Sequence, residues 1–127
     1  YNEFFTAIFR HGLCKLELYK NLKNAYKAGD KAYLEKAANV ILPEAIAAFD
    51  KMYELFKADW KRDYKILDIM MYTHDFGGAR LRMLDAVETI NDYLNGKADC
   101  IEELEAEIIS GINKSWQTPK NYISNFE

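Results

Sequence analysis

The strongest constraint on the fold is an apolar stripe with helical spacing in residues 44–64. Ile46, Phe49, Tyr53, Phe56 and Trp60 recur at steps of three, four, three and four residues, and charged residues occupy positions between them. A helix with one apolar face of this kind packs lengthwise against other helices. We therefore interpret the aromatic stripe as core packing rather than as a cofactor pocket or a sugar-binding platform.

Similar periodicity predicts further helices over residues 3–27, 31–40, 79–95 and 101–109. In the first of these helices, the apolar residues expected to be buried are Phe5, Phe9, Leu13, Leu16, Leu18, Leu22 and Tyr26. In the helix over residues 79–95, the expected buried positions are Met83, Ala86 or Val87, Ile90 and Leu94.

Glycine, aspartate and proline mark where these helices begin and end. Gly29 fits the left-handed position after a helix, and Asp30 can cap the next helix by accepting from its free N–H groups. Pro43 either starts a third helix or kinks a continuous one. Asn95 and Gly96 form the usual end of a helix.

Two adjacent glycines, Gly77 and Gly78, precede the helix expected at residues 79–95. Each glycine costs roughly 1 kcal/mol against alanine in a helix interior. We therefore expect a structural turn at Gly77 and Gly78, or else a helix that the two glycines allow to pack tightly. Residues 65–74 are expected to form an irregular link before the glycines, with a helical turn as the alternative. The predicted fold is all-α: a single antiparallel bundle of four to five helices, with an irregular C-terminal tail that Trp116 docks.

Length and composition indicate one domain over residues 1–127, because a chain of 127 residues that is half hydrophobic suits a single core. The net charge of −3 argues against a nucleic-acid partner. No apolar run is long enough to cross a membrane, so we expect no membrane partner. No secretory signal is visible, so the compartment stays open with the cytoplasm favoured.

The two cysteines, Cys14 and Cys100, are too few for a disulfide framework. We expect two buried thiols, although a single bridge is an alternative. The chain begins at Tyr1 rather than at a methionine, and we therefore expect it to be a C-terminal fragment of a longer chain.

Motifs for common chemistry are missing from the sequence. Neither His11 nor His74 has a glutamate three residues before it, as a di-iron bundle requires, and the cysteines and histidines lack zinc-site spacing. No phosphate-binding loop or nucleophile elbow is present. We therefore predict no cofactor, no metal and no catalytic residue. The adjacent pair His74 and Asp75 is the one polar feature that could reach into a neighbouring site.

Four segments follow one another in a recognisable order: Trp60, Gly77-Gly78, Asp92-Tyr93-Leu94-Asn95-Gly96 and Ile101-Glu102-Glu103-Leu104-Glu105. This order resembles the helical C-terminal domain of bacterial β-N-acetylhexosaminidases of glycoside hydrolase family 20. That family pattern has a tryptophan, the sequence Asp-Ile-Arg-Leu-Gly-Gly, a helix ending in Asp-Tyr-Leu-x-Gly, and an Ile-x-Glu-Leu-Glu segment. Asn113-Lys114-Ser115-Trp116 is loosely similar to a later Asn-Arg-Trp in the family. This chain departs from the pattern where Thr73 and Asp75 replace the acidic residue and the arginine.

The resemblance implies a division of labour between two parts of a longer protein. Family 20 catalysis is substrate-assisted and uses an adjacent Asp-Glu pair on a (β/α)8 barrel. Such a barrel needs about 250 residues, and no Asp-Glu dipeptide occurs in this sequence. The resemblance therefore implies a non-catalytic accessory domain of an exo-acting β-N-acetylhexosaminidase. Its expected partner is the catalytic barrel of the same polypeptide or a second copy in a homodimer.

An accessory domain should leave an apolar patch exposed where the barrel docks. The candidate interface or site-rim residues are Trp60, His74, Asp75, Phe76 and Trp116. One alternative is a free-standing helical interaction or regulatory module without enzymatic activity, which would have a complete polar coat. Another is a bundle that binds a small ligand, which requires a cavity between helices.

Overall fold

The computed structural model describes residues 2–105, apart from the side chains of residues 2, 4 and 5. These residues form helices and turns without a strand, so the all-α prediction is confirmed for this part of the chain. The predicted tail, with Trp116, lies outside the described residues. The elements are α1 (Asn2–Ala28), α2 (Lys31–Lys36), η1 (Ala37–Ile41), α3 (Leu42–Asp63), η2 (Ile66–Ile69), α4 (Met70–Leu94) and α5 (Glu102–Glu105).

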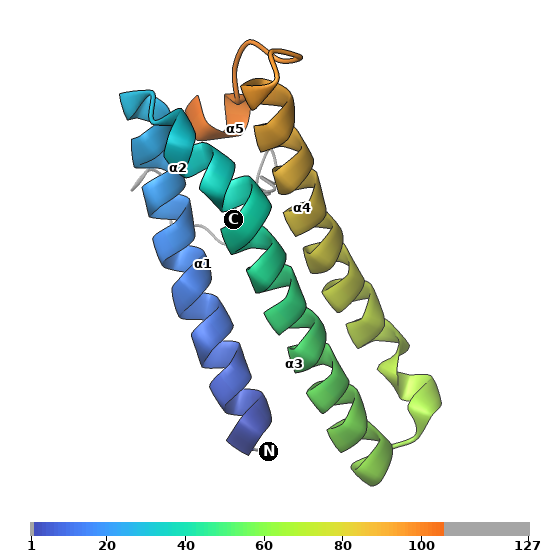
Figure 1. Cartoon of the computed structure of the whole chain (residues 1–127). Coiled ribbons are helices and arrows are strands. Elements are labelled where there is room, and N and C mark those ends of the chain that lie inside the picture. The colour runs from blue at the N-terminus through green and yellow to red at the C-terminus, as the bar shows by residue number, and fades with distance from the viewer. Residues whose placement is uncertain (1, 106–127) are drawn as a thin grey trace, which may run out of the picture.

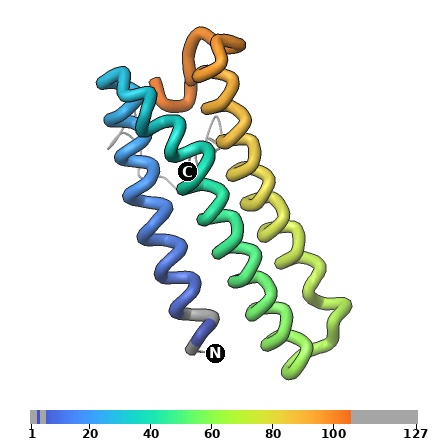
Figure 2. The backbone as a smooth tube through the Cα atoms, viewed as in Figure 1, coloured from blue at the N-terminus to red at the C-terminus, as the bar shows by residue number. Residues whose placement is uncertain are grey.

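Three long helices lie lengthwise side by side, with α3 contacting both α1 and α4 (Figure 1). The chain runs up α1, down α2 to α3 and up α4, so successive long helices are antiparallel (Figure 2). We call the end that holds α2 and α5 the capped end of the bundle. The open end holds the first turn of α1 and the connection between α3 and α4.

The turn between α1 and α2 forms as the sequence predicts. Gly29 has a φ of 70°, and the Tyr33 N–H donates to Asp30 Oδ1 at 3.1 Å, so Asp30 is the N-cap of α2. Gly96, with a φ of 77°, follows the end of α4 in the same way. Both turns are encoded by a few neighbouring residues.

Pro43 lies in the first turn of α3, inside a run of helical structure that continues from α2. Helical structure is unbroken over residues 31–63, and η1 is a π-helical segment in which the Leu42 N–H donates to the Ala37 carbonyl, five residues back. Pro43 has no N–H to donate and would crowd the carbonyl four residues before it in a regular helix. The wider π turn relieves that conflict.

Most of the fully buried side chains gather toward the capped end, where α1, α2, η1 and α4 meet Ile101 and Leu104. Among them, Leu22, Leu34 and Ile90 are at most 1% exposed. A smaller cluster below it joins Ile46, Phe49 and Met52 of α3 to Met83 of α4. The buried stripe predicted for residues 79–95 is confirmed in these two clusters. The stripe predicted for residues 44–64 is confirmed for Ile46 and Phe49, whereas Tyr53, Phe56 and Trp60 are only partly buried.

The buried stripe predicted for the N-terminal half of α1 is wrong. Phe9, Leu13 and Leu16 are 68%, 66% and 72% exposed. The side of α1 that turns toward α3 carries Ala7, His11 and Leu18 instead. Helical spacing correctly predicts an apolar face, but α1 has two such faces. The face that packs against α3 is the one with Ala7, His11 and Leu18.

The structural turn predicted at Gly77 and Gly78 is also wrong. Both glycines lie inside α4, which begins at Met70. The irregular connection is therefore shorter than expected, because it is limited to Tyr64, Lys65 and the single 3-10 turn η2. A Cβ atom added at either glycine meets nothing within 4 Å, so no described neighbour requires glycine there.

Truncation of the main core should have a large cost. We expect Ile90→Ala to lower the free energy of unfolding by about 2 to 5 kcal/mol, because it opens a cavity at a fully buried site. The matched control is Leu81→Ala on the same helix, where the side chain is exposed and the change should be small. Urea unfolding followed by circular dichroism measures both. Equal losses in the two variants would contradict this description of the core.

Alanine at Gly77 or Gly78 should stabilise the chain. We expect each substitution to raise the free energy of unfolding by about 0.5 to 1 kcal/mol, because alanine favours a helix interior and fits the open space. Gly29→Ala is the control with the opposite sign, since it places a Cβ at a positive φ. Destabilisation at both Gly77 and Gly78 would show that these residues are not interior to a helix.

Candidate docking surface

An aromatic cluster joins α3 to the start of α4 at the open end of the bundle. The Phe56 ring lies 5.7 Å from Trp60, 5.3 Å from Tyr72 and 5.2 Å from Phe76, between ring centroids. Trp60 and Phe76, which were predicted as interface or rim residues, are thus brought together. Tilted rings at these distances attract one another through their quadrupoles in addition to burying apolar area.

Hydrogen bonds hold the chain as it passes from α3 to α4. Trp60 Nε1 donates to the Lys65 carbonyl at 2.9 Å, and the Tyr64 N–H donates to the Trp60 carbonyl at 2.7 Å. Thr73 Oγ1 donates to the Ile69 carbonyl at 3.3 Å and lies 3.2 Å from Tyr53 Oη. These bonds fix the backbone of the connection, so most of its side chains cannot turn into the core.

The side chains of this connection form an exposed apolar surface. Leu67 and Met71 are 83% and 76% exposed, while only Ile69 of η2 is buried. We name this surface the open-end patch, made of Tyr64, Ile66, Leu67, Met70 and Met71. A contiguous apolar patch on a polar bundle is typical of a protein–protein contact.

The other two predicted rim residues do not join the aromatic cluster. His74 and Asp75 are exposed on α4, next to the open-end patch in sequence, whereas Phe76 turns toward α3. Consecutive helix residues point in different directions, and the two side chains are therefore not a preformed pair. Their contribution to a neighbouring site stays a prediction.

An ion pair that was not predicted from the sequence links α3 to α4. Arg80 donates through Nε and one terminal nitrogen to the two Asp50 oxygens, at 2.8 and 3.3 Å. The residues are thirty positions apart, so no local spacing signals the contact. Both side chains are partly exposed, and a pair of this kind contributes little to stability but fixes the alignment of the two helices.

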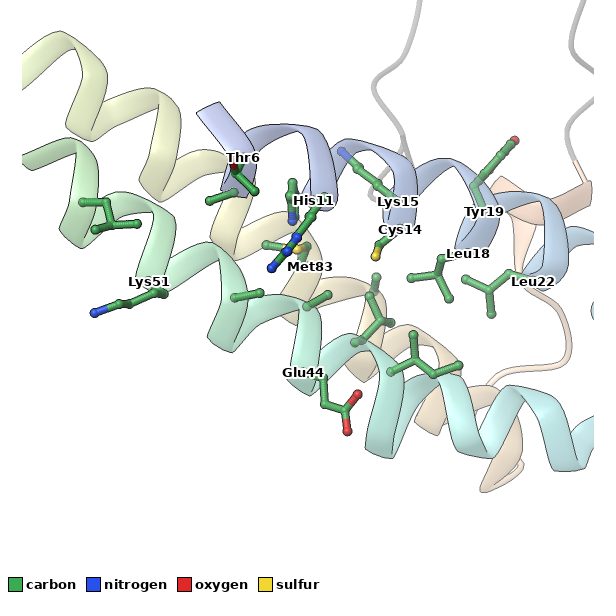
Figure 3. A pocket seen from close by; sticks show the side chains of 18 of the residues that line it. Thr6, His11, Cys14, Lys15, Leu18, Tyr19, Leu22, Glu44, Lys51 and Met83 are labelled. Atoms are coloured by element: carbon green, nitrogen blue, oxygen red, sulfur yellow. The ribbon is translucent and has the colours of Figure 1, made fainter. Parts of the chain in front are cut away.

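A groove of about 700 Å³ lies between α1 and α3, with Met83 of α4 at its base (Figure 3). His11, Cys14 and Leu18 point into the space between the helices, whereas Glu44 and Lys51 point outward (Figure 3). The groove is the kind of cavity that a small-ligand-binding bundle requires. Its described lining is mostly apolar and also includes the polar side chains of Thr6, Arg10, His11 and Lys15.

His11 is the titratable group most affected by this groove. Its pKa is lowered from the usual 6.5, first by burial and then by the positive charge of Lys15. The imidazole also lies 5.1 Å from the Phe49 ring, between centroids. His11 is therefore neutral at pH 7 and acts as a packing residue between α1 and α3.

The cysteines differ from the prediction of two buried thiols. Both are free, but Cys14 is exposed and Cys100 is only partly buried. The pKa of Cys100 is raised, first by burial and then by the nearby carboxylates of Glu105, Glu102 and Asp99. A thiol whose pKa is raised is a poor nucleophile at neutral pH.

Two features are missing from residues 2–105. Among these residues, no group of three or more histidine, cysteine, aspartate or glutamate side chains could hold a metal ion. None of the described helices is long and apolar enough to cross a membrane. The described residues form a helical bundle with apolar side chains exposed at its open end and along α1.

The described residues form an all-helical bundle, and a comparison with protein families indicates the class to which it belongs. Over residues 5–123 the sequence matches the family of the Glycoside Hydrolase 20C C-terminal domain. This match covers most of the chain, which therefore belongs to that family, and the predicted resemblance is confirmed. A comparison with curated proteins gave no match.

The buried imidazole gives a pH dependence that one substitution can isolate. Because the pKa of His11 is lower in the folded state, the stability that depends on neutral His11 is present above pH 6.5 and is lost as the pH falls from 6.5 through the folded pKa. We expect His11→Gln to show a smaller loss of unfolding free energy between two pH values on either side of 6.5.

Titration of carboxylates changes the free energy of unfolding of both the wild type and His11→Gln. The difference between the two proteins therefore reports on His11. Urea titrations at each pH provide the free energies. Identical pH dependence in the two proteins would show that His11 is not shielded from solvent by the helices around it.

Proposed function

We propose that this domain packs through the open-end patch on the catalytic (β/α)8 barrel of an exo-acting β-N-acetylhexosaminidase. In this arrangement the domain stabilises the barrel and shapes the rim of its active site, while bond cleavage belongs to the barrel. The observation that carries the proposal is the exposed patch in a chain that belongs to a glycoside hydrolase C-terminal domain family.

The position of the patch supports this contact. The first turn of α1 and the α3–α4 connection lie at the same end of the bundle (Figure 1). A catalytic portion that precedes α1 in the chain would therefore connect at the open end, close to the patch. Because the two parts would be joined at that end, the patch would meet the catalytic portion within one chain. The catalytic portion would then be present at a high effective concentration near the patch.

The patch also suits a permanent contact. Methionine and tyrosine are enriched in the buried cores of interfaces, while lysine, glutamate and aspartate are depleted there. Two methionines give the patch side chains that adapt to the shape of a facing surface. A free-standing module would instead need a polar coat at this end, and the exposed Leu67 and Met71 do not fit that alternative.

His74 and Asp75 follow the patch in sequence and are exposed on α4. A barrel seated on Met70 and Met71 would bring the first turns of α4 near its surface. His74 and Asp75 are therefore the polar residues of this domain that we expect nearest the rim of the barrel. Trp60 and Phe76 support the patch from inside, through the aromatic cluster.

The test uses the complete enzyme, with barrel and helical domain together. We expect Leu67→Asp and Met71→Asp to separate thermal unfolding into two transitions, because a buried charge disrupts the contact between the two parts. We also expect hydrolysis of a chromogenic N-acetyl-β-glucosaminide to fall by roughly fivefold or more, since an interface residue that contributes more than about 1 kcal/mol changes an equilibrium constant by about that factor.

Leu84→Asp on α4 is the matched control, because Leu84 is also exposed but lies away from the open end. Unchanged unfolding and unchanged hydrolysis in the Leu67 and Met71 variants would overturn the proposal. The proposal would also be overturned if the Leu67 and Met71 variants lost a homodimer but kept a single unfolding transition. That result would assign the patch to a contact between two copies of the enzyme.

A further inference from the structure

The N-terminal half of α1 carries a second apolar stripe, on the side that faces away from the core. Phe9, Leu13 and Leu16 are exposed, whereas Leu18 is buried in the main core. Two residues along a helix turn the chain by about 200°, so Leu16 lies nearly opposite Leu18. A surface helix ordinarily carries one apolar stripe, and further exposed apolar surface is typical of a protein–protein contact. We call Phe9, Leu13 and Leu16 the outer stripe of α1.

We propose that the outer stripe is a contact between two copies of this chain, in which the two α1 helices pack antiparallel. Phe9, Leu13, Leu16 and Lys20 are separated by four, three and four residues, the repeat that lines the seam between two coiled helices. Gly12 borders the stripe, and a Cβ atom added there would meet nothing within 4 Å, so another helix can approach closely. Because a two-fold axis relates two such copies, the stripe of one meets the same stripe of the other.

The lysines that continue the stripe favour the antiparallel direction. Lys20 and Lys27 follow Leu16 on the same face of α1 and are exposed. In a parallel pair, each of these lysines would lie beside the same lysine of the other copy, and the like charges would repel. In an antiparallel pair with Leu13 level with Leu16 of the other copy, Lys20 lies level with Phe9 instead. An ammonium group over an aromatic ring is attracted to it.

The charges beside the stripe fit the same register. Arg10 and Glu17 flank it on one side, and both are exposed. With Leu13 level with Leu16 of the other copy, Arg10 of each copy lies beside Glu17 of the other, as charged residues do next to the seam of a coiled coil. The two-fold axis makes this ion pair occur twice. Within one α1, seven residues separate Arg10 from Glu17, whereas side-chain pairs on a helix form at three or four residues.

This contact leaves the open-end patch accessible. The outer stripe lies on α1, which packs against α3, and the patch lies on the connection from α3 to α4 (Figure 1). The two surfaces are thus on different elements of the bundle. A dimer through α1 and the proposed contact with a catalytic barrel can therefore exist in one assembly.

Sedimentation of the complete enzyme over a dilution series tests the contact. We expect the wild type to be a dimer that dissociates on dilution. Leu13→Asp should raise the dissociation constant by roughly tenfold or more, because it places a charge at the centre of the contact. Leu81→Asp on α4 is the matched control, since Leu81 is similarly exposed and its substitution should leave the dimer unchanged.

Charge reversal separates pairing between copies from a local effect on α1. We expect Arg10→Glu and Glu17→Arg each to raise the dissociation constant by roughly tenfold, since each creates two like-charged pairs across the two-fold axis. The double variant restores both pairs with exchanged signs and should return the dissociation constant close to the wild-type value. Glu88→Arg, at an exposed position of α4, is the control for a change in net charge.

Three results would overturn the proposal. One is a wild-type enzyme that stays monomeric at every concentration of the series. Another is a dimer that Leu13→Asp and Arg10→Glu leave unchanged, which would assign it to a different surface. The third is a double variant that associates no better than Arg10→Glu or Glu17→Arg alone. The contact with the barrel is tested by its own variants, which leave the outer stripe intact.

Discussion

Packing at the capped end is the interaction on which the rest of the bundle depends. Leu22 of α1, Leu34 of α2 and Ile90 of α4 are fully buried there, together with Ile101 and Leu104. A close-packed cluster of this kind resists small changes in volume, so it holds four segments of the chain in one arrangement. Because this core is concentrated at one end, the other end is left with fewer buried side chains and more exposed apolar surface.

This uneven distribution explains why exposed apolar side chains gather at the open end. At the open end, the aromatic cluster and the Arg80–Asp50 pair keep α3 and α4 aligned without enclosing the residues of the connection. The connection then presents Leu67 and Met71 on a backbone that hydrogen bonds hold in place. A rigid apolar surface loses little conformational entropy on binding, which is the condition for a stable contact between domains.

Much of the fold could be predicted from the sequence because much of it is local. The N-cap at Asp30, the left-handed residues Gly29 and Gly96, and the apolar period from Ile46 to Trp60 each depend on neighbouring residues. The errors arose where distant packing decides. Gly77 and Gly78 favour a turn by propensity, but α4 continues through them because its flanking residues pack on α3. Phe9 and Leu13 show helical spacing, but spacing cannot tell which face of α1 meets α3.

The departures from the family pattern now have a physical interpretation. Thr73 stands where the family pattern has an acidic residue, and its hydroxyl lies within hydrogen-bonding distance of Tyr53 Oη and bonds the Ile69 carbonyl. The Thr73 hydroxyl therefore makes its contacts within the domain, to α3 and to η2. Asp75 stands where the pattern has an arginine, and it is exposed on α4. Reversal of charge at an exposed position disfavours the surface that an arginine would face, so a barrel that receives this domain should carry a compensating positive or neutral group opposite Asp75.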